Sequence, residues 1–374
     1  MGLRITSLKL VDFRNYESFS LDDIGELTIF VGRNGVGKTN ILESIDLLTS
    51  ADSFRHAQIA QIIRQGCQSA RMEMELSDGN RKLTNALSLE TGKKRYTVNG
   101  KAKSVSDVKG MLPAVSFIPD DLEMAKKSSS VKRGALDELG AQLSKSYYMV
   151  HRDYEKALRY KNRLLKDESP QDLIDAINET LLTCATQLYC YRHSLYRRIV
   201  PLVESHYRAI AHSDEQFGAS YLPSWDYLNN GGREMGIVGF DGGIPDREVV
   251  REHLENALVR YNADERVRHR SIVGPHNDKI AFYLGDKDAS VFASQGQQRS
   301  IVLAWKLAEV ELVRVKTGAN PALLLDDVMS ELDEQRRNML VKAVGEDAQT
   351  FITATDLSSF NESLLSRGRV VELR

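Results

Sequence analysis

Eight consecutive residues combine the types and the spacing needed to hold a phosphate group. Residues 32–39 read Gly-Arg-Asn-Gly-Val-Gly-Lys-Thr, which fits the P-loop pattern G-x-x-x-x-G-K-[ST]. The glycines let the backbone bend so that successive N–H groups converge on one point. Lys38 would then reach the β- and γ-phosphates of a nucleotide, and the Thr39 hydroxyl would ligate Mg²⁺. The alternative is a glycine-rich turn that happens to contain a lysine.

The segments on either side of this stretch are those that a P-loop requires. Leu27–Val31 is an apolar run that predicts a strand, and apolar residues recur at helical spacing from Ile41 to Leu48. The N-terminus of that helix would direct its positive end at a bound phosphate. The setting therefore favours nucleotide binding over the simple turn.

Two carboxylates follow a second apolar run. Leu323-Leu324-Leu325 leads directly into Asp326 and Asp327, and acidic residues at the carboxyl end of a buried strand lie where α/β sheets bind ligands. Asp326 would complete the Mg²⁺ shell opposite Thr39, and Asp327 could orient or deprotonate an attacking water. Alone, the pattern is equally typical of a strand followed by an acidic turn.

A second phosphate-binding helix end is predicted at Ser294-Gln295-Gly296-Gln297, which opens a helix running to about Lys316. A serine hydroxyl and a glycine N–H at a helix start suit an anion. Because one chain already has such an end at its P-loop, the second is expected to serve the nucleotide of another copy.

Composition limits the other possibilities. The chain has 374 residues, 42% hydrophobic and 27% charged, with a formal net charge of −2, as expected of a soluble globular protein that is not constitutively basic. It has no apolar run of transmembrane length, and its three cysteines form no C-x-x-C pair. We therefore expect a cytoplasmic protein without a structural zinc site or a disulfide framework.

The order of the predicted elements gives an α/β protein with a helical insertion. Strands dominate the first third, amphipathic helices fill about 131–211, a glycine-rich stretch covers 212–245, and α/β character returns after it. We expect an ATPase head with a mixed sheet and a β-rich N-terminal part, formed by residues 1–124 and 266–374. Residues 125–265 would form the inserted helical arm.

Several motifs resemble one known class of ATPase. Ser294–Arg299 resembles the signature motif of ABC-type ATPases, and Ser330–Asp333 resembles their D-loop. Thr355 stands where many members of the class have a switch histidine. Together with Phe13–Tyr16, Phe117–Leu122 and Gly274–His276, these motifs resemble the RecF family of bacterial recombination-mediator ATPases from the N-terminus to the last strand.

The resemblance implies a monomer that forms a homodimer when ATP and Mg²⁺ are bound, with slow, weak ATP hydrolysis that resets the dimer. It also implies binding to DNA at single-strand gaps and single-strand/double-strand junctions, in replication, repair and the SOS response. RecO and RecR would be partners in loading RecA. The implied catalytic residues are Lys38, Asp326 and Asp327, and the implied metal ligands are Thr39 and Asp326. The implied nucleotide-binding residues are Gly32, Arg33, Asn34, Gly35, Val36, Gly37, Lys38, Thr39, Asn40, Arg14, Ser294, Gly296 and Gln297.

Two departures from the family pattern concern regions outside the P-loop. Lys126–Arg133 keeps its charge but lacks the usual glycine and proline, and Asn277 replaces the usual arginine after Gly274-Pro275-His276. His276 itself is expected to be structural.

The predicted helical arm carries the best candidates for DNA contact. Lys156, Arg159, Arg163 and Arg197 are interleaved with tyrosines, and the tyrosines are expected to form the core of the arm. A basic helix is about equally often a solvated face; in the functional interpretation, two arms clamp a duplex through its phosphates. The alternatives are an SMC-like structural clamp, which the short arm disfavours, and an ABC-type ATPase or P-loop kinase that does not act on DNA.

Overall fold

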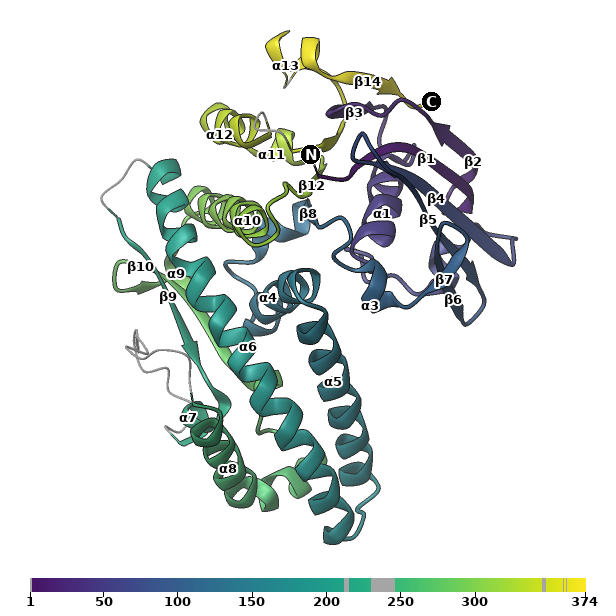
Figure 1. Cartoon of the computed structure of the whole chain (residues 1–374). Helices are drawn as coiled ribbons and strands as arrows, with labels where there is room; N and C mark the ends of the chain where they lie inside the picture. The colour runs from purple at the N-terminus through teal and green to yellow at the C-terminus, as the bar shows by residue number, and fades with distance from the viewer. Residues whose placement is uncertain (1, 212–214, 230–245, 345–347, 359, 361) are drawn as a thin grey trace. The chain divides into compact units, whose positions relative to one another are not determined.

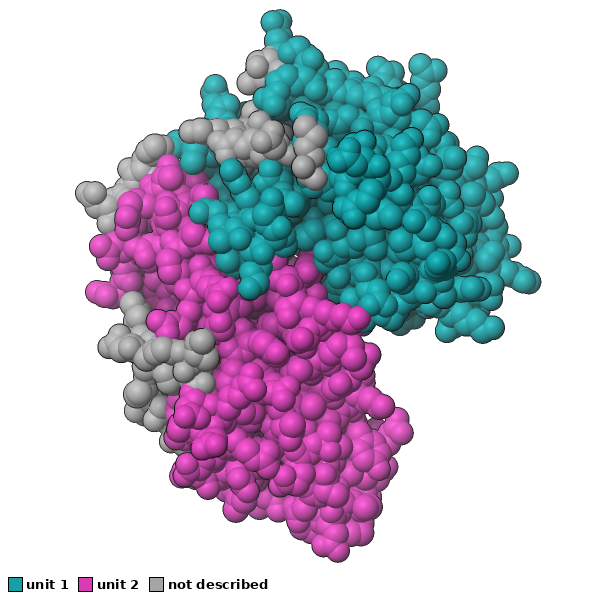
Figure 2. All heavy atoms as spheres, in the orientation of Figure 1, with its two compact units in different colours: residues 1–122, 302–374 teal, residues 123–301 magenta. Residues whose placement is uncertain are grey.

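The computed structural model describes the whole chain except residues 1, 212–214, 230–245, 345–347, 359 and 361. The chain folds into two compact units, shown in different colours in Figure 2. Unit 1 comprises residues 1–122 and 302–374, and unit 2 comprises residues 123–301.

A parallel five-stranded sheet forms one layer of unit 1. Its strand order is β14-β3-β13-β12-β8, with bounds Arg369–Glu372, Leu27–Val31, Thr350–Ala354, Ala322–Asp326 and Ala114–Phe117. All residues of β12 and β13 are buried, which explains their unbroken apolar sequence. The predicted P-loop strand and the predicted carboxylate strand are both in this sheet, separated by β13.

An antiparallel six-stranded sheet forms the other layer, in the order β2-β1-β4-β5-β6-β7. The strands span Tyr16–Leu21, Arg4–Phe13, Ser69–Ser77, Lys82–Glu90, Lys93–Val98 and Lys101–Lys103. Burial alternates along β4, as expected of a sheet with one covered face. Asn99 and Gly100 both have positive φ between β6 and β7, as a two-residue hairpin turn of the Asn-Gly type requires.

Helix α1 (Lys38–Thr49) lies between the two sheets (Figure 1). Ten of its twelve residues are buried, so its C-terminal carbonyls cannot be solvated. Side chains of the antiparallel sheet satisfy them: Asn85 Nδ2 donates to Leu48 O (2.6 Å), and Tyr96 Oη donates to Leu47 O (2.9 Å). The antiparallel sheet thus fixes the helix that follows the P-loop.

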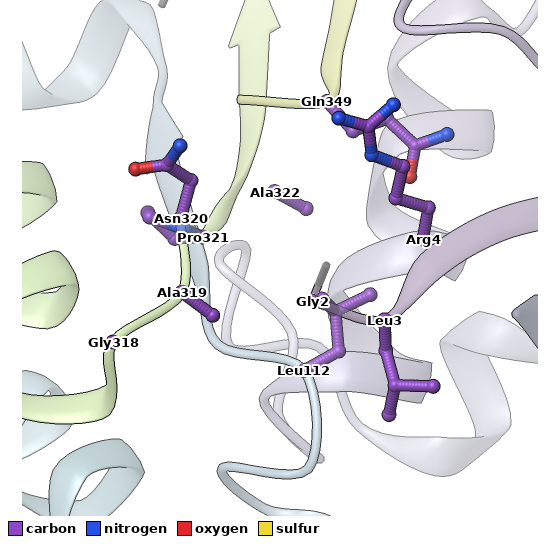
Figure 3. A pocket seen from close by; sticks show the side chains of 10 residues that line it. All are labelled: Gly2, Leu3, Arg4, Leu112, Gly318, Ala319, Asn320, Pro321, Ala322 and Gln349. Atoms are coloured by element: carbon purple, nitrogen blue, oxygen red, sulfur yellow. The ribbon is translucent and has the colours of Figure 1, made fainter. Parts of the chain in front are cut away.

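Short helices complete unit 1. They are α2 (Ile59–Ile62), α3 (Val105–Val108), the 3₁₀ helix η1 (Pro119–Glu123), α11 (Val328–Glu331), α12 (Glu334–Val344) and α13 (Glu362–Arg367). A cavity of about 220 Å³ lies beside Arg4, Ala322 and Gln349 (Figure 3). Because Ala322 begins β12 and Gln349 precedes β13, this cavity is at the amino ends of the strands, away from the P-loop end.

Unit 2 is built on helices α4 (Ser129–Leu143), α5 (Lys145–Lys166) and α6 (Gln171–Ala211), with α7 (Ser224–Asn229) and α8 (Arg247–Val267). Helices α5 and α6 pack along each other, which confirms the predicted pair of arm helices. The predicted helical stretch, about 131–211, is interrupted at Ser144, which has extended backbone angles and whose side chain accepts a hydrogen bond from Tyr147 N. The apolar spacing continues across this break, so periodicity did not reveal it.

A small antiparallel sheet completes unit 2, in the order β11-β10-β9. Its strands span Lys287–Asp288, Lys279–Leu284 and Phe217–Leu222, followed by α9 (Ala289–Phe292) and α10 (Gln295–Thr317). Residues 266–301, which we expected in the head, therefore lie in unit 2, because β10 pairs along its length with β9. The unit boundary falls within α10.

The glycine-rich stretch 212–245 contains a strand and a short helix. Residues 217–222 form β9, and Trp225 is buried on α7. The glycines at 231, 232, 242 and 243 and Pro245 lie outside the described residues.

Candidate nucleotide-binding site

The P-loop adopts a conformation that only glycine accommodates at two positions. Gly35 has φ 84° and Gly37 has φ 111°, in the left-handed region that other residues rarely enter. A Cβ atom on Gly37 would lie 2.6 to 2.8 Å from side-chain atoms of Asn15 and Tyr16. The last glycine of the motif is therefore required both by its backbone angles and by its neighbours.

Lys38 and Thr39 emerge from the first turn of α1 towards the end of the parallel sheet. Lys38 is buried, and its Nζ donates to Gly32 O (2.6 Å) and Arg33 O (3.1 Å). Thr39 Oγ1 donates to Asp326 Oδ1 (2.8 Å). Residues 287 positions apart thus meet as predicted, and their two oxygens are close enough to bind a single Mg²⁺ ion, which prefers oxygen ligands.

Thr353, at the end of β13, holds both carboxylate residues in place. Its Oγ1 donates to Asp326 Oδ1 (2.7 Å) and accepts from Asp327 N (2.9 Å), and the residue is fully buried. Two hydroxyls therefore fix one oxygen of Asp326, and Oδ2 has no donor among the described residues. The sequence marks Thr353 only by its place at the end of a strand, and that strand is parallel to β12.

Asp327 occupies an unusual position just after β12. Its backbone is left-handed, with φ 51°, and it is the N-cap of α11. Ser330 Oγ donates to Asp327 O (2.8 Å). Burial raises the pKa of the Asp327 carboxyl, while nearby Lys38 opposes the rise. A carboxylate with a raised pKa accepts a proton more readily, which suits a base for water.

The turn between β1 and β2 supports the P-loop through Asn15. Asn15 Nδ2 donates to Val36 O (2.9 Å), and its Oδ1 accepts from Asn40 Nδ2 (2.8 Å). The preceding Arg14, which we expected at the nucleotide, instead has a bidentate contact with the buried Glu43 (2.8 and 2.5 Å) and a bond to Gln61 O. In this conformation its guanidinium anchors α1, so nucleotide contact by Arg14 stays a prediction.

The rest of the predicted P-loop residues form the exposed tip of the site. Arg33, Asn34 and Gly35 are exposed, and Val36 is half-buried. The tip is thus open to a ligand, whereas Lys38 and the β12 carboxylate are held beneath it.

The predicted second phosphate-binding end lies in unit 2, at the start of α10. Ser294 Oγ accepts from Gln297 N (3.2 Å), and Gln297 Oε1 accepts from Ser294 N (2.7 Å), which is a capping box. Gln297 Nε2 also donates to Glu215 (2.8 Å). The Ser294 side chain is exposed, and its hydroxyl hydrogen remains able to donate to an incoming oxygen.

The basic residues of the arm divide into buried and exposed groups. Lys161 Nζ lies 2.6 Å from Glu265 Oε2, and Arg192 makes a bidentate contact with Asp137 (2.9 and 2.8 Å); both basic residues are buried. The four predicted DNA-contacting residues are instead all exposed: Lys156, Arg159, Arg163 and Arg197. Of the arm tyrosines, Tyr147, Tyr154 and Tyr189 are buried, as predicted, but Tyr160 is half exposed.

His276 has a structural position, as expected. Its Nδ1 lies 2.5 Å from Tyr154 Oη, and its Nε2 lies 3.2 Å from Ser271 O. Burial lowers the pKa of His276 to about 4. A neutral ring with Nε2 protonated would donate to Ser271 O and accept from Tyr154.

Two features are absent from the residues that the structure describes. No helix among them is long and apolar enough to cross a membrane. No group of three or more His, Cys, Asp or Glu side chains among them is arranged to hold a metal ion.

A P-loop that follows strand β3 of a parallel sheet, covered by an antiparallel sheet, is the fold of an ABC-type ATPase head. The sequence profile of the RecF/RecN/SMC N-terminal domain matches residues 4–369. Within that group, the chain belongs to the RecF family. It is 36% identical to the DNA replication and repair protein RecF of Symbiobacterium thermophilum, over 94% of this chain and 92% of that protein. RecF of Thermosynechococcus vestitus is also 36% identical, over 95% and 92%.

Solved structures agree with this assignment. The recombination mediator protein RecF with ATP, from the RecFOR pathway, superposes with a TM-score of 0.85 at 28% identity, covering 96% of this chain and 94% of that one. An Smc head bound to the C-terminal winged-helix domain of ScpA gives a TM-score of 0.52 at 13% identity, over 98% and 93%. The similarity to the Smc head concerns the fold alone.

Proposed function

We propose that this chain binds ATP with Mg²⁺ at its P-loop and uses the nucleotide to control an association with DNA in replication and repair. The observation that carries the proposal is the contact between Thr39 Oγ1 and Asp326 Oδ1 (2.8 Å). It joins the phosphate-binding motif to the carboxylate strand at one point. A RecF structure that is 28% identical to this chain is described with ATP.

The residues around that point have distinct roles in this proposal. The backbone amides of residues 33–38 and the Lys38 ammonium would bind the phosphates, after Nζ leaves the carbonyls it now contacts. Thr39 and Asp326 would hold Mg²⁺, which draws electron density from the phosphate oxygens when bound. Asp327 would take a proton from water, with its carboxyl oriented by the backbone contact to Thr353. Slow hydrolysis to ADP and phosphate would follow.

A second copy of the chain would complete the site. Ser294, Gly296 and Gln297 form a helix start whose serine donor is exposed, and α10 is 23 residues long. Val291 and Phe292, just before it, are 69% and 65% exposed. Two adjacent large apolar side chains at such exposure fit a surface that a partner covers. We infer that ATP binding brings this surface onto the P-loop of a partner copy.

Light scattering tests the association. ATP with Mg²⁺ should double the mass of the wild type, and Asp327→Asn should prolong the dimer by slowing hydrolysis. Ser294→Arg should block the dimer, whereas Ser18→Arg, at another exposed serine, should not. A wild-type mass unchanged by ATP would refute the composite site, and a Ser294→Arg protein that still phosphorylated a small molecule would indicate a kinase.

The DNA contact is proposed to be the exposed face of α5. Arg152, Lys156, Arg159, Arg163 and Lys166 recur at spacings of four and three, which places them on one face over about 21 Å of helix. All five are exposed, and such a row suits the phosphate backbone of a strand. The partners RecO and RecR are part of the same proposal, supported by the RecFOR pathway named for the similar structures. A preference for gaps or junctions is proposed with them.

Fluorescence anisotropy with labelled duplex, gapped duplex and single strand tests this contact. Affinity should fall steeply with salt, and the double change Arg159→Gln, Arg163→Gln should reduce both affinity and the salt slope. Arg208→Gln, at an exposed position on α6, is the matched control. An equal reduction in the control, or no reduction in the double variant, would exclude α5 as the contact.

A further inference from the structure

A second cavity lies within unit 2 and belongs to no part of the site described above. Its volume is about 320 Å³, and it is lined by residues of α5, α7 and the chain that follows α8. The residues that matter here are Asn162, Tyr227, Arg268, Arg270, Asn277 and Lys279. Pockets of this size hold small ligands or single groups of larger ones.

The lining of this cavity is strongly positive. Three cations line it, Arg268, Arg270 and Lys279, and no Asp or Glu does. In the part of the chain that the structure describes, neither arginine has an ion pair or a side-chain hydrogen bond. Lys279 Nζ lies 4.8 Å from the centre of the Tyr227 ring, an interaction that leaves its three donors for other partners.

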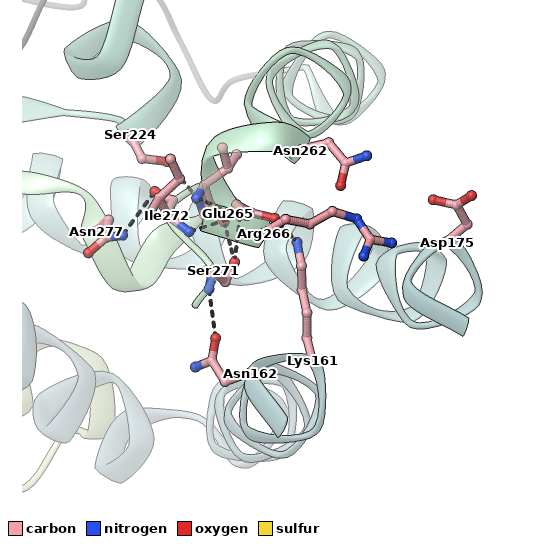
Figure 4. Close-up of polar contacts among 12 residues, drawn as sticks. Lys161, Asn162, Asp175, Ser224, Asn262, Glu265, Arg266, Ser271, Ile272 and Asn277 are labelled. Atoms are coloured by element: carbon pink, nitrogen blue, oxygen red, sulfur yellow. Dashed lines mark hydrogen bonds and ion pairs between the residues drawn. The ribbon is translucent and has the colours of Figure 1, made fainter. Parts of the chain in front are cut away.

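The Glu265 carboxylate next to the cavity is already neutralised. The Glu265 Oε1 atom accepts from Ser271 Oγ (2.9 Å), Ile272 N (2.8 Å) and Val273 N (3.2 Å), while Oε2 pairs with Lys161. These contacts occupy both oxygens of Glu265 (Figure 4). The net charge available to a ligand is therefore positive.

The same contacts make the cavity wall rigid. Asn162 Oδ1, on α5, accepts from Ser271 N (2.7 Å), and Asn277 Nδ2 donates to Ile272 O (2.9 Å) (Figure 4). Segment 271–273 is thereby attached to α8, to α5 and to the turn at Asn277. The basic segment that precedes it, residues 268–270, is anchored at its end, so a ligand would not have to order it.

The chemistry fits a phosphate group. Two arginine forks and a lysine supply the planar and point-charge donors that bind phosphate oxygens. The Asn162 Nδ2 group adds a neutral donor that has no partner among the described residues. A carboxylate ligand would use the same donors, but the proposed DNA contact on α5 favours phosphate: Asn162 lies between Arg159 and Arg163 in the sequence of that helix.

We propose that this cavity is a phosphate-binding site, in which a backbone phosphate of a DNA strand lying along α5 contacts Arg268, Arg270 and Lys279. The proposal rests on the proposed DNA-binding function and extends it from the surface of α5 into the cavity beside it. The departure at Asn277 belongs to this wall: an amide there braces the backbone at Ile272, and the positive charge is supplied by the two arginines upstream.

The test uses the full chain and the double variant Arg268→Gln, Arg270→Gln, with Arg247→Gln at the other end of α8 as control. Both arginines of the variant are exposed and unpaired among the described residues, so folding should not change. Duplex affinity, measured by anisotropy from about 50 to 200 mM NaCl, should fall about tenfold at the lower salt. The slope of log affinity against log salt should decrease by about one for each phosphate that the variant no longer binds. The control should match the wild type.

The outcomes separate the two proposals. If the wild type binds DNA and the double variant binds with the same affinity and slope, the cavity is not a phosphate site, while the DNA function stands. If the wild type binds no DNA, the DNA function fails. Binding of inorganic phosphate then tests separately whether the cavity is a phosphate site. Amide exchange of residues 266–280 should then slow with phosphate in the wild type and not in the double variant; no slowing in the wild type would overturn the site.

Discussion

Thr353→Val removes one hydroxyl and leaves a side chain of nearly the same shape, which makes it the sharpest test of the site geometry. The change removes two hydrogen bonds, one to the Asp326 carboxylate (2.7 Å) and one from the Asp327 amide (2.9 Å). A bond to a charged group contributes about 1.5 to 3 kcal/mol, and an unsatisfied buried amide costs about 1 to 3 kcal/mol. Asp327 is partly exposed, so water can relieve part of the second cost. We expect local stability to fall by about 3 kcal/mol.

Amide hydrogen exchange measures this change directly. A local opening made easier by about 3 kcal/mol should exchange roughly 100-fold faster. The readout is the deuterium uptake of a peptide that covers residues 324–329, measured by mass spectrometry on protein without nucleotide. Thr353→Ser keeps the hydroxyl and is the matched control, with exchange close to that of the wild type. Exchange in Thr353→Val within about threefold of the wild type would refute the role assigned to Thr353.

Gly37→Ala should weaken ATP binding at least about tenfold more than Gly35→Ala in a nucleotide titration, because both have positive φ but only Gly37 has side-chain atoms within 3 Å of a new Cβ. Equal effects would refute the packing argument. The pKa of His276 is about 4 in the folded protein, below its usual 6.5, so its contribution to stability is complete above about pH 6.5 and disappears as the pH falls towards 4. Urea unfolding should show this decrease in the free energy of unfolding, up to about 3 kcal/mol. His276→Gln should reduce the dependence of that free energy on pH; a variant with the same pH dependence as the wild type would exclude this histidine as the cause. Lys161→Met should cost about 3 to 5 kcal/mol, since it leaves the Glu265 carboxylate buried without its cation. The double change Lys161→Met, Glu265→Gln should recover part of that stability by urea unfolding, and no recovery would mean that packing, not charge, dominates.

The sequence was informative where the signal is local. The P-loop lies within eight residues, and its strand and helix are its direct neighbours, so their order follows from spacing alone. The strand ending at Asp326 could be recognised because burial on both faces requires an unbroken apolar run. The contact between Thr39 and Asp326 was then expected from the geometry that such motifs share.

Contacts between distant residues were beyond such reasoning. Nothing near Arg14 indicates that Glu43 will hold it. Lys161 falls on the apolar stripe of α5, between Leu158 and Leu165, but nothing near it indicates the carboxylate that pairs with it. Each depends on a carboxylate brought close only by the fold. The extent of the head was wrongly predicted for the same reason: residues 266–301 join unit 2 through pairing of β10 with β9, which are far apart in the sequence.

The position of β3 has a consequence for how the protein is made. Its two neighbours in the sheet are β13 and β14, and a Cβ on Gly32 would lie 2.7 Å from the carbonyl oxygen of Leu373. While the ribosome is translating the middle of the chain, the P-loop strand therefore has no partner in its sheet. A product shortened before residue 350 would carry the complete P-loop motif yet lack both strands that support it. The chain would therefore become able to hold a nucleotide only after the last strand had been translated.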